Sequence, residues 1–201
     1  MRNINQREAK ELIKKYEKSL IAAVKAGFGR YKNEILPQIS LTCKRTKANI
    51  IRDFILQEIK KLNFNGLKVH HANQNKEDLA IILLEKKIAL RIKKIDKNRK
   101  SRNNKTQQTK SFLGQTLELD LLDVVPTYCD LGYKLDKTGT NIEIVTVVCR
   151  LGKVVMWECI LSDKGIGTVS QQSHLYEEEP VTKKKRISAK KSNSAGITKI
   201  G

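Results

Sequence analysis

The sequence predicts an α+β protein with a mostly antiparallel sheet. Apolar residues recur at helical spacing through the first 60 residues, and β-rich runs broken by turn residues follow them. The predicted order is two N-terminal helices, a short strand and a β-hairpin, a further helix, a three-stranded antiparallel meander and a disordered basic C-terminal tail. A length of 201 residues suits one domain with appendages.

The first predicted helix covers residues 6–35. Asn5 can cap its start, and Pro37 ends it because the residue before a proline is disfavoured in helical conformation. Gly27 and Gly29 weaken its middle, so a break is expected there if anywhere. The residues that share one helix face are Ala9, Leu12, Ile13, Tyr16, Leu20, Val24, Phe28, Tyr31 and Ile35.

The second predicted helix covers residues 44–62, with Thr42 as its cap. Four cations, Lys44, Arg45, Lys47 and Arg52, crowd its first half, although positive charge near a helix N-terminus is unfavourable. They indicate either an anion site or a solvated basic face. The apolar stripe consists of Ile50, Ile51, Phe54, Ile55, Ile59 and Leu62.

A change from helical to alternating periodicity marks the start of the sheet. Residues 66–69 predict a short strand, and residues 79–84 and 88–95 predict a hairpin that turns at 85–87. Alternation along the second hairpin strand places Arg91 and Lys93 on one face of the sheet.

Residues 96–105 contain almost no apolar side chains and predict a flexible, highly charged loop. Thr106 can cap a helix that runs to about Leu119. One face of this helix carries Gln108, Phe112 and Gln115. That face is either a polar recognition surface or, as we favour, a packing surface for Phe112 with the glutamines in solvent.

Three further strands are predicted at residues 127–135, 142–149 and 154–161, with turns supplied by residues 136–139 and 151–152. We expect Met156 and Trp157 to lie in the core of this meander.

Composition divides the chain into three parts. We predict an N-terminal helical segment at 1–40, an α+β domain at 41–163 and a disordered basic tail at 164–201. No apolar run approaches the ~18 residues of a membrane span, and the N-terminus shows no signal-peptide pattern. We therefore expect a cytoplasmic protein.

Metal and cofactor sites are not indicated. The four cysteines, Cys43, Cys129, Cys149 and Cys159, form no CxxC pair. The last three lie in apolar surroundings and are interpreted as buried thiols. Neither a P-loop nor a dinucleotide fingerprint is present, so we predict no cofactor.

Positive charge is the strongest functional signal. The chain carries 40 basic and 21 acidic residues, and residues 86–110 hold eleven basic residues against Asp96 alone. A basic block of this density indicates a polyanionic partner, either nucleic acid or an acidic protein surface. The candidate contact residues are Arg91, Lys93, Lys94, Lys97, Arg99, Lys100, Arg102 and Lys105, extended by Lys44, Arg45 and Lys47.

A nuclease of the restriction-endonuclease type is a less favoured interpretation. Such a site needs a metal-binding acid near an acid-x-Lys pair, and Asp78 with Glu85 and Lys87 are the candidates. Glu85 and Lys87 fall at the predicted turn, and Asp78 is about 23 Å away at strand rise. We therefore predict a binding protein and not an enzyme.

A set of spaced residues resembles a poorly characterised family of small prokaryotic proteins that are encoded beside HExxH-type zinc metallopeptidases, in toxin–antitoxin-like or phage-defence modules. The residues that carry the resemblance are Leu90-Arg91-Ile92-Lys93-Lys94-Ile95-Asp96, Thr106-Gln107-Gln108, Phe112, Gln115, Leu131-Gly132-Tyr133-Lys134-Leu135, Trp157 and Ile160-Leu161. The resemblance covers residues 40–161 and implies an antitoxin or regulator role with the peptidase as partner. It assigns no catalytic residue.

The sequence thus predicts a non-catalytic, nucleic-acid-binding regulator or antitoxin-like component. The alternative is a protein–protein regulator of a partner metallopeptidase that does not bind nucleic acid. The two differ in salt dependence, because a nucleic-acid binder should lose affinity steeply as salt rises, whereas a specific protein complex depends on apolar anchors.

Overall fold

The computed structural model describes residues 4–40, 43–62, 65–72, 79–101, 106–117 and 125–162. All of them belong to one unit, Met1–Ser170, in which the N-terminal helices and the sheet share a hydrophobic core. The second unit, Gln171–Gly201, lies outside the described residues, as does the whole of the predicted tail.

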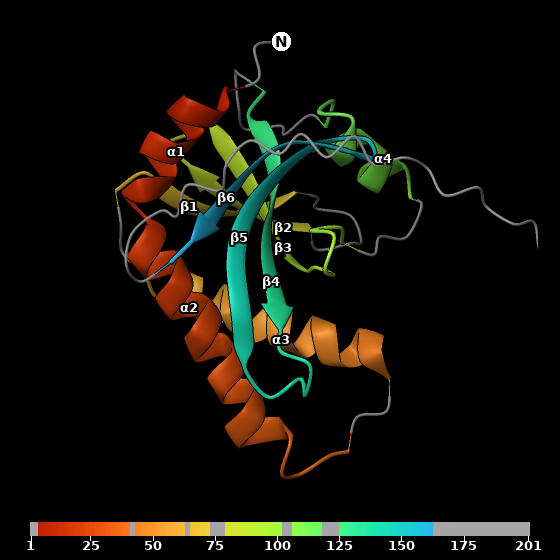
Figure 1. The fold of residues 1–201 in the computed structure, drawn as a ribbon. Helices are drawn as coiled ribbons and strands as arrows, with labels where there is room; N and C mark the ends of the chain where they lie inside the picture. Colours follow the sequence, from red (N-terminus) through yellow and green to blue (C-terminus); the bar gives the residue numbers. More distant parts are fainter. Residues whose placement is uncertain are drawn as a thin grey trace, which may run out of the picture. The chain divides into compact units, whose positions relative to one another are not determined.

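The centre of the fold is a mixed sheet whose six described strands follow the chain order (Figure 1). Its strands are β1 (Leu67–Ala72), β2 (Leu79–Leu84), β3 (Ile88–Lys94), β4 (Thr127–Leu135), β5 (Ile142–Leu151) and β6 (Val154–Leu161). Neighbouring strands are antiparallel except β3 and β4, which pair in parallel from Ile88↔Thr127 to Lys94↔Tyr133. The α+β class is therefore confirmed.

The predicted three-stranded meander is not a separate sheet. Strands β4, β5 and β6 continue the sheet of the β2–β3 hairpin through the β3–β4 pairing. A parallel pair needs a crossover connection, and the segment between β3 and β4 contains helix α4 (Gln107–Leu113).

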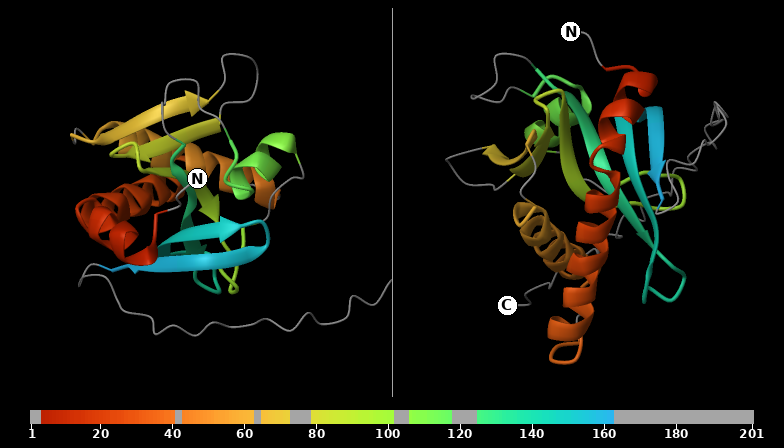
Figure 2. Two further views of the ribbon diagram at one scale, coloured as in Figure 1. Left: turned by 90° about the horizontal axis from the view of Figure 1, so that it is seen from above. Right: turned by 90° about the vertical axis from the view of Figure 1, so that its left-hand side faces the viewer.

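Helices cover both faces of the sheet (Figure 2). Helices α1 (Gln6–Lys14), α2 (Glu17–Arg30) and α3 (Lys44–Lys60), with the π-helical turn η1 (Tyr31–Ile35), pack on one face. Helix α4 packs on the other through a smaller cluster of Ile81, Leu83, Ala89, Phe112 and Tyr128.

The first helix is interrupted at Lys15–Tyr16, so the expectation of one helix with a weak point at its glycines was wrong. The backbone N–H groups of Lys15 and Tyr16 bond three residues back, to Leu12 and Ile13, which tightens the helix there. Tyr16 is buried and donates its hydroxyl to the Asn65 carbonyl, and Lys15 pairs with Glu85. Both partners lie outside the helix, so tertiary contacts fix the position of the break.

Gly27 instead lies where α2 and α3 approach each other closely. A Cβ atom built on Gly27 would lie 2.5 Å from the Ile55 backbone nitrogen and 2.6 Å from its Cα. One turn further on, Arg30 stacks over the Phe54 ring at 4.4 Å and pairs with Glu58 of α3 at 3.3 Å. The missing side chain of Gly27 therefore allows the two helices to pack backbone to backbone.

The apolar stripe of α3 is confirmed, with Ile51, Ile55 and Ile59 buried in the core. The prediction that Thr42 caps this helix was wrong, because Cys43 occupies the N-cap position and makes no side-chain cap bond. Thr42 itself lies outside the described residues.

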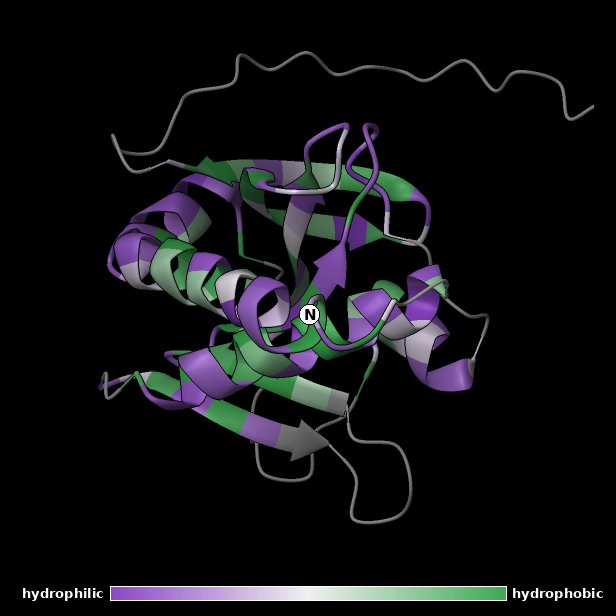
Figure 3. Cartoon of the chain, turned by 90° about the horizontal axis from the view of Figure 1, so that it is seen from below, coloured by the Kyte–Doolittle hydropathy of each residue, from purple (hydrophilic) through white to green (hydrophobic). Residues whose placement is uncertain are grey.

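Alternation along β6 separates two residues that were both expected in the core. Trp157 faces α1, is 8% exposed and donates its indole N–H to the Ile4 carbonyl, whereas Met156 points to the other face and is 56% exposed. The placement of Met156 in the core was therefore wrong. Cys129, Cys149 and Cys159 are buried as predicted. In Figure 3 the helices are striped with hydrophilic and hydrophobic residues, as expected for helices with one face on a core.

The two glycines of α2 provide a matched pair of variants. Gly27→Ala should lower the free energy of unfolding by about 1–3 kcal/mol, because its Cβ meets Ile55 backbone that has to move. Gly29→Ala, which meets nothing within 4 Å, should raise it by about 0.5–1 kcal/mol through helix propensity. Urea denaturation measures both, and equal effects would contradict the close helix contact.

Candidate functional site

The face of the sheet opposite α1–α3 is covered by α4 and by residues 95–101. Thr106 caps α4 as predicted, accepting a bond from the Thr109 N–H at 3.1 Å. The helix ends at Leu113 and not near Leu119, and Phe112 packs its ring against Tyr128 with the centroids 5.0 Å apart. Phe112 is thus a packing residue, as favoured from the sequence.

Gln115 is not solvated, contrary to expectation. It follows α4 with a positive φ of 60°, which turns its side chain into the interior. Its amide N–H groups donate to the carbonyls of Tyr128 at 2.7 Å and Arg150 at 3.0 Å, and its carbonyl accepts the Tyr128 N–H at 2.7 Å. Gln115 therefore links the end of the α4 segment to strands β4 and β5. It bonds to them just beyond Cys129↔Cys149, where the backbone pairing of the two strands ends.

A cluster of buried charges lies beside Phe112, and we call it the Asp130 cluster: Arg91, Asp130, Arg150 and Ser101. Asp130 is 2% exposed, and its Oδ1 accepts two bonds from Arg91, from Nε at 3.0 Å and from Nη2 at 2.9 Å. Its Oδ2 accepts bonds from Arg150 Nη2 at 2.6 Å and from Ser101 Oγ at 2.9 Å. The Arg91 guanidinium also stacks over the Phe112 ring at 4.0 Å.

Sequence reasoning missed Asp130, Arg150 and Ser101. A usable signal existed, because Asp130 and Arg150 are charged residues that each lie between two apolar neighbours in a strand. Such residues are rarely buried unless they are paired. The sequence could not show that the parallel register sets Arg91 beside Asp130.

Residues 95–101 form an ordered turn, which we call the basic turn. Ile95 and Ser101 pair as an isolated antiparallel bridge. Asp96 Oδ1 accepts the backbone N–H groups of Asn98 and Lys100, both at 2.9 Å, and the Asp96 N–H donates to the Lys100 carbonyl. The prediction of a flexible loop was therefore wrong for residues 96–101, while Arg102 and Lys105 lie outside the described residues.

The predicted contact residues around this turn differ in exposure. Lys94, Lys97 and Lys100 are exposed. Arg99 is half-buried, has a positive φ of 58° and pairs with Glu158 of β6 at 2.8 Å. Arg91 belongs to the Asp130 cluster and is 4% exposed, so its guanidinium is occupied inside the protein.

Lys93 has an environment of its own. It lies on the same face as Arg91, as predicted, and is half-buried. Burial, followed by the neighbouring Arg91 charge, lowers the pKa of the Lys93 ammonium to about 8. Both effects disfavour the charged form of an amine.

The cations at the start of α3 lie on a different element from the basic turn. Lys44 and Arg45 are exposed, and the Lys47 ammonium lies 5.3 Å from the centre of the Tyr31 ring. Helix α3 packs through Ile51, Ile55 and Ile59 into the core that contains Ile88 and Leu90, whereas the basic turn is bonded to Asp130 through Ser101.

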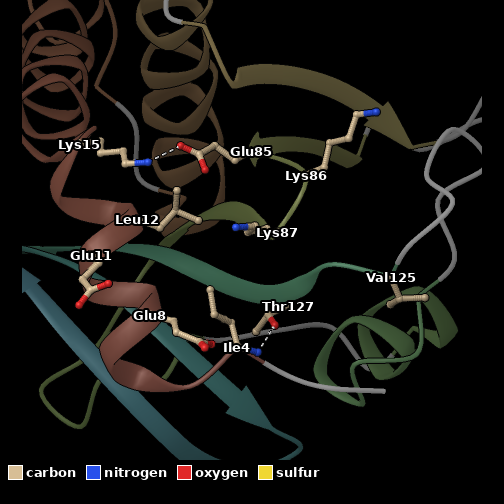
Figure 4. A pocket seen from close by; sticks show the side chains of 10 residues that line it. All are labelled: Ile4, Glu8, Glu11, Leu12, Lys15, Glu85, Lys86, Lys87, Val125 and Thr127. Atoms are coloured by element: carbon tan, nitrogen blue, oxygen red, sulfur yellow. Dashed lines mark hydrogen bonds and ion pairs between the residues drawn. The ribbon is translucent and has the colours of Figure 1, made fainter.

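A pocket of about 510 Å³ opens between the start of α1 and the β2–β3 turn (Figure 4). Lys15 and Glu85 meet at 2.8 Å across its rim, while Lys86 points away from it. Glu85 and Lys87, the acid-x-Lys pair considered for a nuclease, flank Lys86 at the turn as predicted, and both line the pocket. Their third candidate, Asp78, lies outside the described residues.

Within the described ranges, no three His, Cys, Asp or Glu side chains gather so that they could hold a metal ion. No helix in that part of the chain has the length and apolar character needed to cross a bilayer.

Asp130→Asn tests the Asp130 cluster. The variant leaves two buried guanidinium groups without their counterion, so the free energy of unfolding should fall by about 3–5 kcal/mol. Glu143→Gln, which removes the partner of Lys134 from an exposed ion pair, should change it by less than about 1 kcal/mol. Thermal and urea unfolding distinguish the two, and a mild effect of Asp130→Asn would show that the cluster contributes little to folding.

A scan against protein-family models found no match, and searches of curated proteins and of solved structures found no similar chain. The resemblance to a family of small prokaryotic proteins therefore stays a prediction. Function has to be inferred from the chain's own residues and their positions.

Proposed function

We propose that this protein is a non-catalytic nucleic-acid-binding protein that contacts the phosphate backbone through the basic turn. The main support for this proposal is that the basic turn is held by hydrogen bonds and exposes Lys97 and Lys100 to solvent. A regulatory or antitoxin-like role in a prokaryotic or phage-defence module is the wider setting that we propose for this binding.

The order of the turn supports binding because it reduces the entropy that association would cost. Asp96, the single acid of the basic block, is used within the turn to hold the Asn98 and Lys100 N–H groups. Ser101 ties the end of the turn to Asp130, which is itself buried. Lysines fixed in this way lose little backbone freedom when an anion binds.

Contacts to phosphates fit this surface better than contacts to bases. Within the described part of the chain, the rings of seven aromatic residues are buried and Phe54 is half-buried. Proteins that hold single strands by stacking need exposed aromatic side chains. Lysine charge, in contrast, suits phosphates without requiring a base sequence.

A protein partner is a second candidate, and exposed apolar residues on β5 and β6 favour it. Leu151 and Val154 are register partners beside the β5–β6 turn, and they are 46% and 62% exposed. Met156 follows on the same strand. An exposed apolar group of this kind is typical of a protein contact, and a regulator of a partner metallopeptidase would use it whether or not the basic turn binds nucleic acid.

The double variant Lys97→Ala/Lys100→Ala tests the proposed function. It should weaken binding to labelled duplex or single-stranded nucleic acid. On a duplex, the slope of log K against log salt should become shallower by about 2, because each neutralised phosphate accounts for roughly 0.9 of that slope. Fluorescence anisotropy across ~50–200 mM salt measures both quantities. Stability should hardly change, because exposed charges contribute little to folding.

The matched control is Lys137→Ala/Lys153→Ala, which removes the same charge from exposed lysines in the β4–β5 and β5–β6 turns. If the control pair loses as much affinity as the test pair, the general positive field and not the basic turn is responsible. Absence of binding by the unaltered protein at low salt would overturn the proposed function and leave the protein-partner candidate.

A further inference from the structure

We propose that the Lys93 ammonium, which lies on β3 beside the basic turn, is the innermost phosphate contact of this surface and makes nucleic-acid binding sensitive to pH. This inference rests on the proposed function. It names the residue that the sequence did not distinguish from the ten other candidate cations.

Asp130 has no acceptor position left for Lys93. An ionised carboxylate offers about four acceptor positions on its two oxygens. Arg91 fills two positions on Oδ1, and Arg150 and Ser101 fill two on Oδ2. The one buried acid of the cluster is therefore saturated by groups other than Lys93.

The surroundings of Lys93 are rich in positive charge. Arg91 on β3, Arg150 on β5 and Arg52 on α3 act on its ammonium unfavourably, and Asp130 on β4 acts favourably. Arg52 is paired with Asp53 at 2.9 Å, and Arg91 and Arg150 share Asp130. Among the described residues, Lys93 forms no hydrogen bond or ion pair, so it is the cation of this group that still needs an anion.

Lys93 lies directly beside the basic turn. Lys93 precedes Ile95, the first residue of the basic turn, by two residues, and both lie on the face of the sheet that the turn covers. Lys97 and Lys100 are exposed on the same turn. A phosphate bound by Lys97 and Lys100 would approach the half-buried ammonium of Lys93 at the start of the turn. Lower solvent exposure there strengthens the attraction between phosphate and ammonium.

The pH dependence follows from the direction of the Lys93 shift. The pKa of Lys93 is lowered to about 8 in the free protein, so the ammonium is largely charged at pH 7 and largely neutral at pH 9. A bound phosphate favours the charged form and raises the pKa. By linkage, affinity is retained below pH 8 and falls by about tenfold between pH 7 and pH 9.

The experiment measures affinity for a labelled duplex and a labelled single strand from pH 6.5 to 9.5 at fixed salt, using the full chain. The unaltered protein should show the tenfold fall. Lys93→Arg, which stays charged, should bind at least as well and show no fall. Lys93→Met should bind weakly at pH 7 and show no fall either. Lys137→Met, which removes an exposed lysine elsewhere, should keep the fall seen in the unaltered protein.

The outcomes separate this inference from the proposed function. If nucleic acid binds but Lys93→Arg keeps the full pH dependence, the inference is overturned and the proposed function stands. If the unaltered protein binds nucleic acid at no pH, both are overturned. Polyglutamate at matched charge is the protein-like probe, and equal binding with the same Lys93-dependent pH profile would overturn the assignment to phosphate.

Discussion

The pairing of one carboxylate with two guanidinium groups holds the second face of the sheet together. Asp130 joins β3 through Arg91, β5 through Arg150 and the basic turn through Ser101, so these three segments meet on one buried acid. Removing two or three charges from water is costly, and the cost is offset only when each bond is well made. The hydrogen bonds that fill the acceptor positions of Asp130 meet that condition. They also leave no acceptor position on Asp130 for the neighbouring cation, Lys93.

Local patterns predicted the elements well, because each depends on residues close in sequence. The stripe of Ile51, Ile55 and Ile59 identified α3, and Thr106 identified the start of α4. The parallel joining of β3 to β4 could not be predicted this way, since no short-range pattern distinguishes a strand that starts a new sheet from one that extends an old one. The break at Lys15–Tyr16 was missed for a similar reason, because its contacts with Asn65 and Glu85 are tertiary.

The sequence predicted which region carries the candidate site, from its charge, but not how the side chains of that region are arranged. Eleven basic residues in 25 positions pointed to residues 86–110, but charge counting treats all cations alike. The structure divides them by environment: Arg91 is used internally, Arg99 is paired with Glu158, and Lys97 is exposed. Lys93 differs from all of these because the acceptor positions of Asp130 are already filled by Arg91, Arg150 and Ser101. Burial and saturation of partners, not composition, therefore select the residues on which the function is proposed to depend.

The contact between the start of α1 and β6 has a consequence for how the chain folds as it is made. Gln6 donates to the Glu158 carbonyl and Trp157 donates to the Ile4 carbonyl, across 152 and 153 residues of sequence. Contacts of such long separation form slowly, because a large loop has to close before they are gained. On the ribosome, the first helix would leave the exit tunnel long before its strand is synthesised. Its apolar face would have to be covered by α2 and α3, or by a chaperone, until β6 has been synthesised.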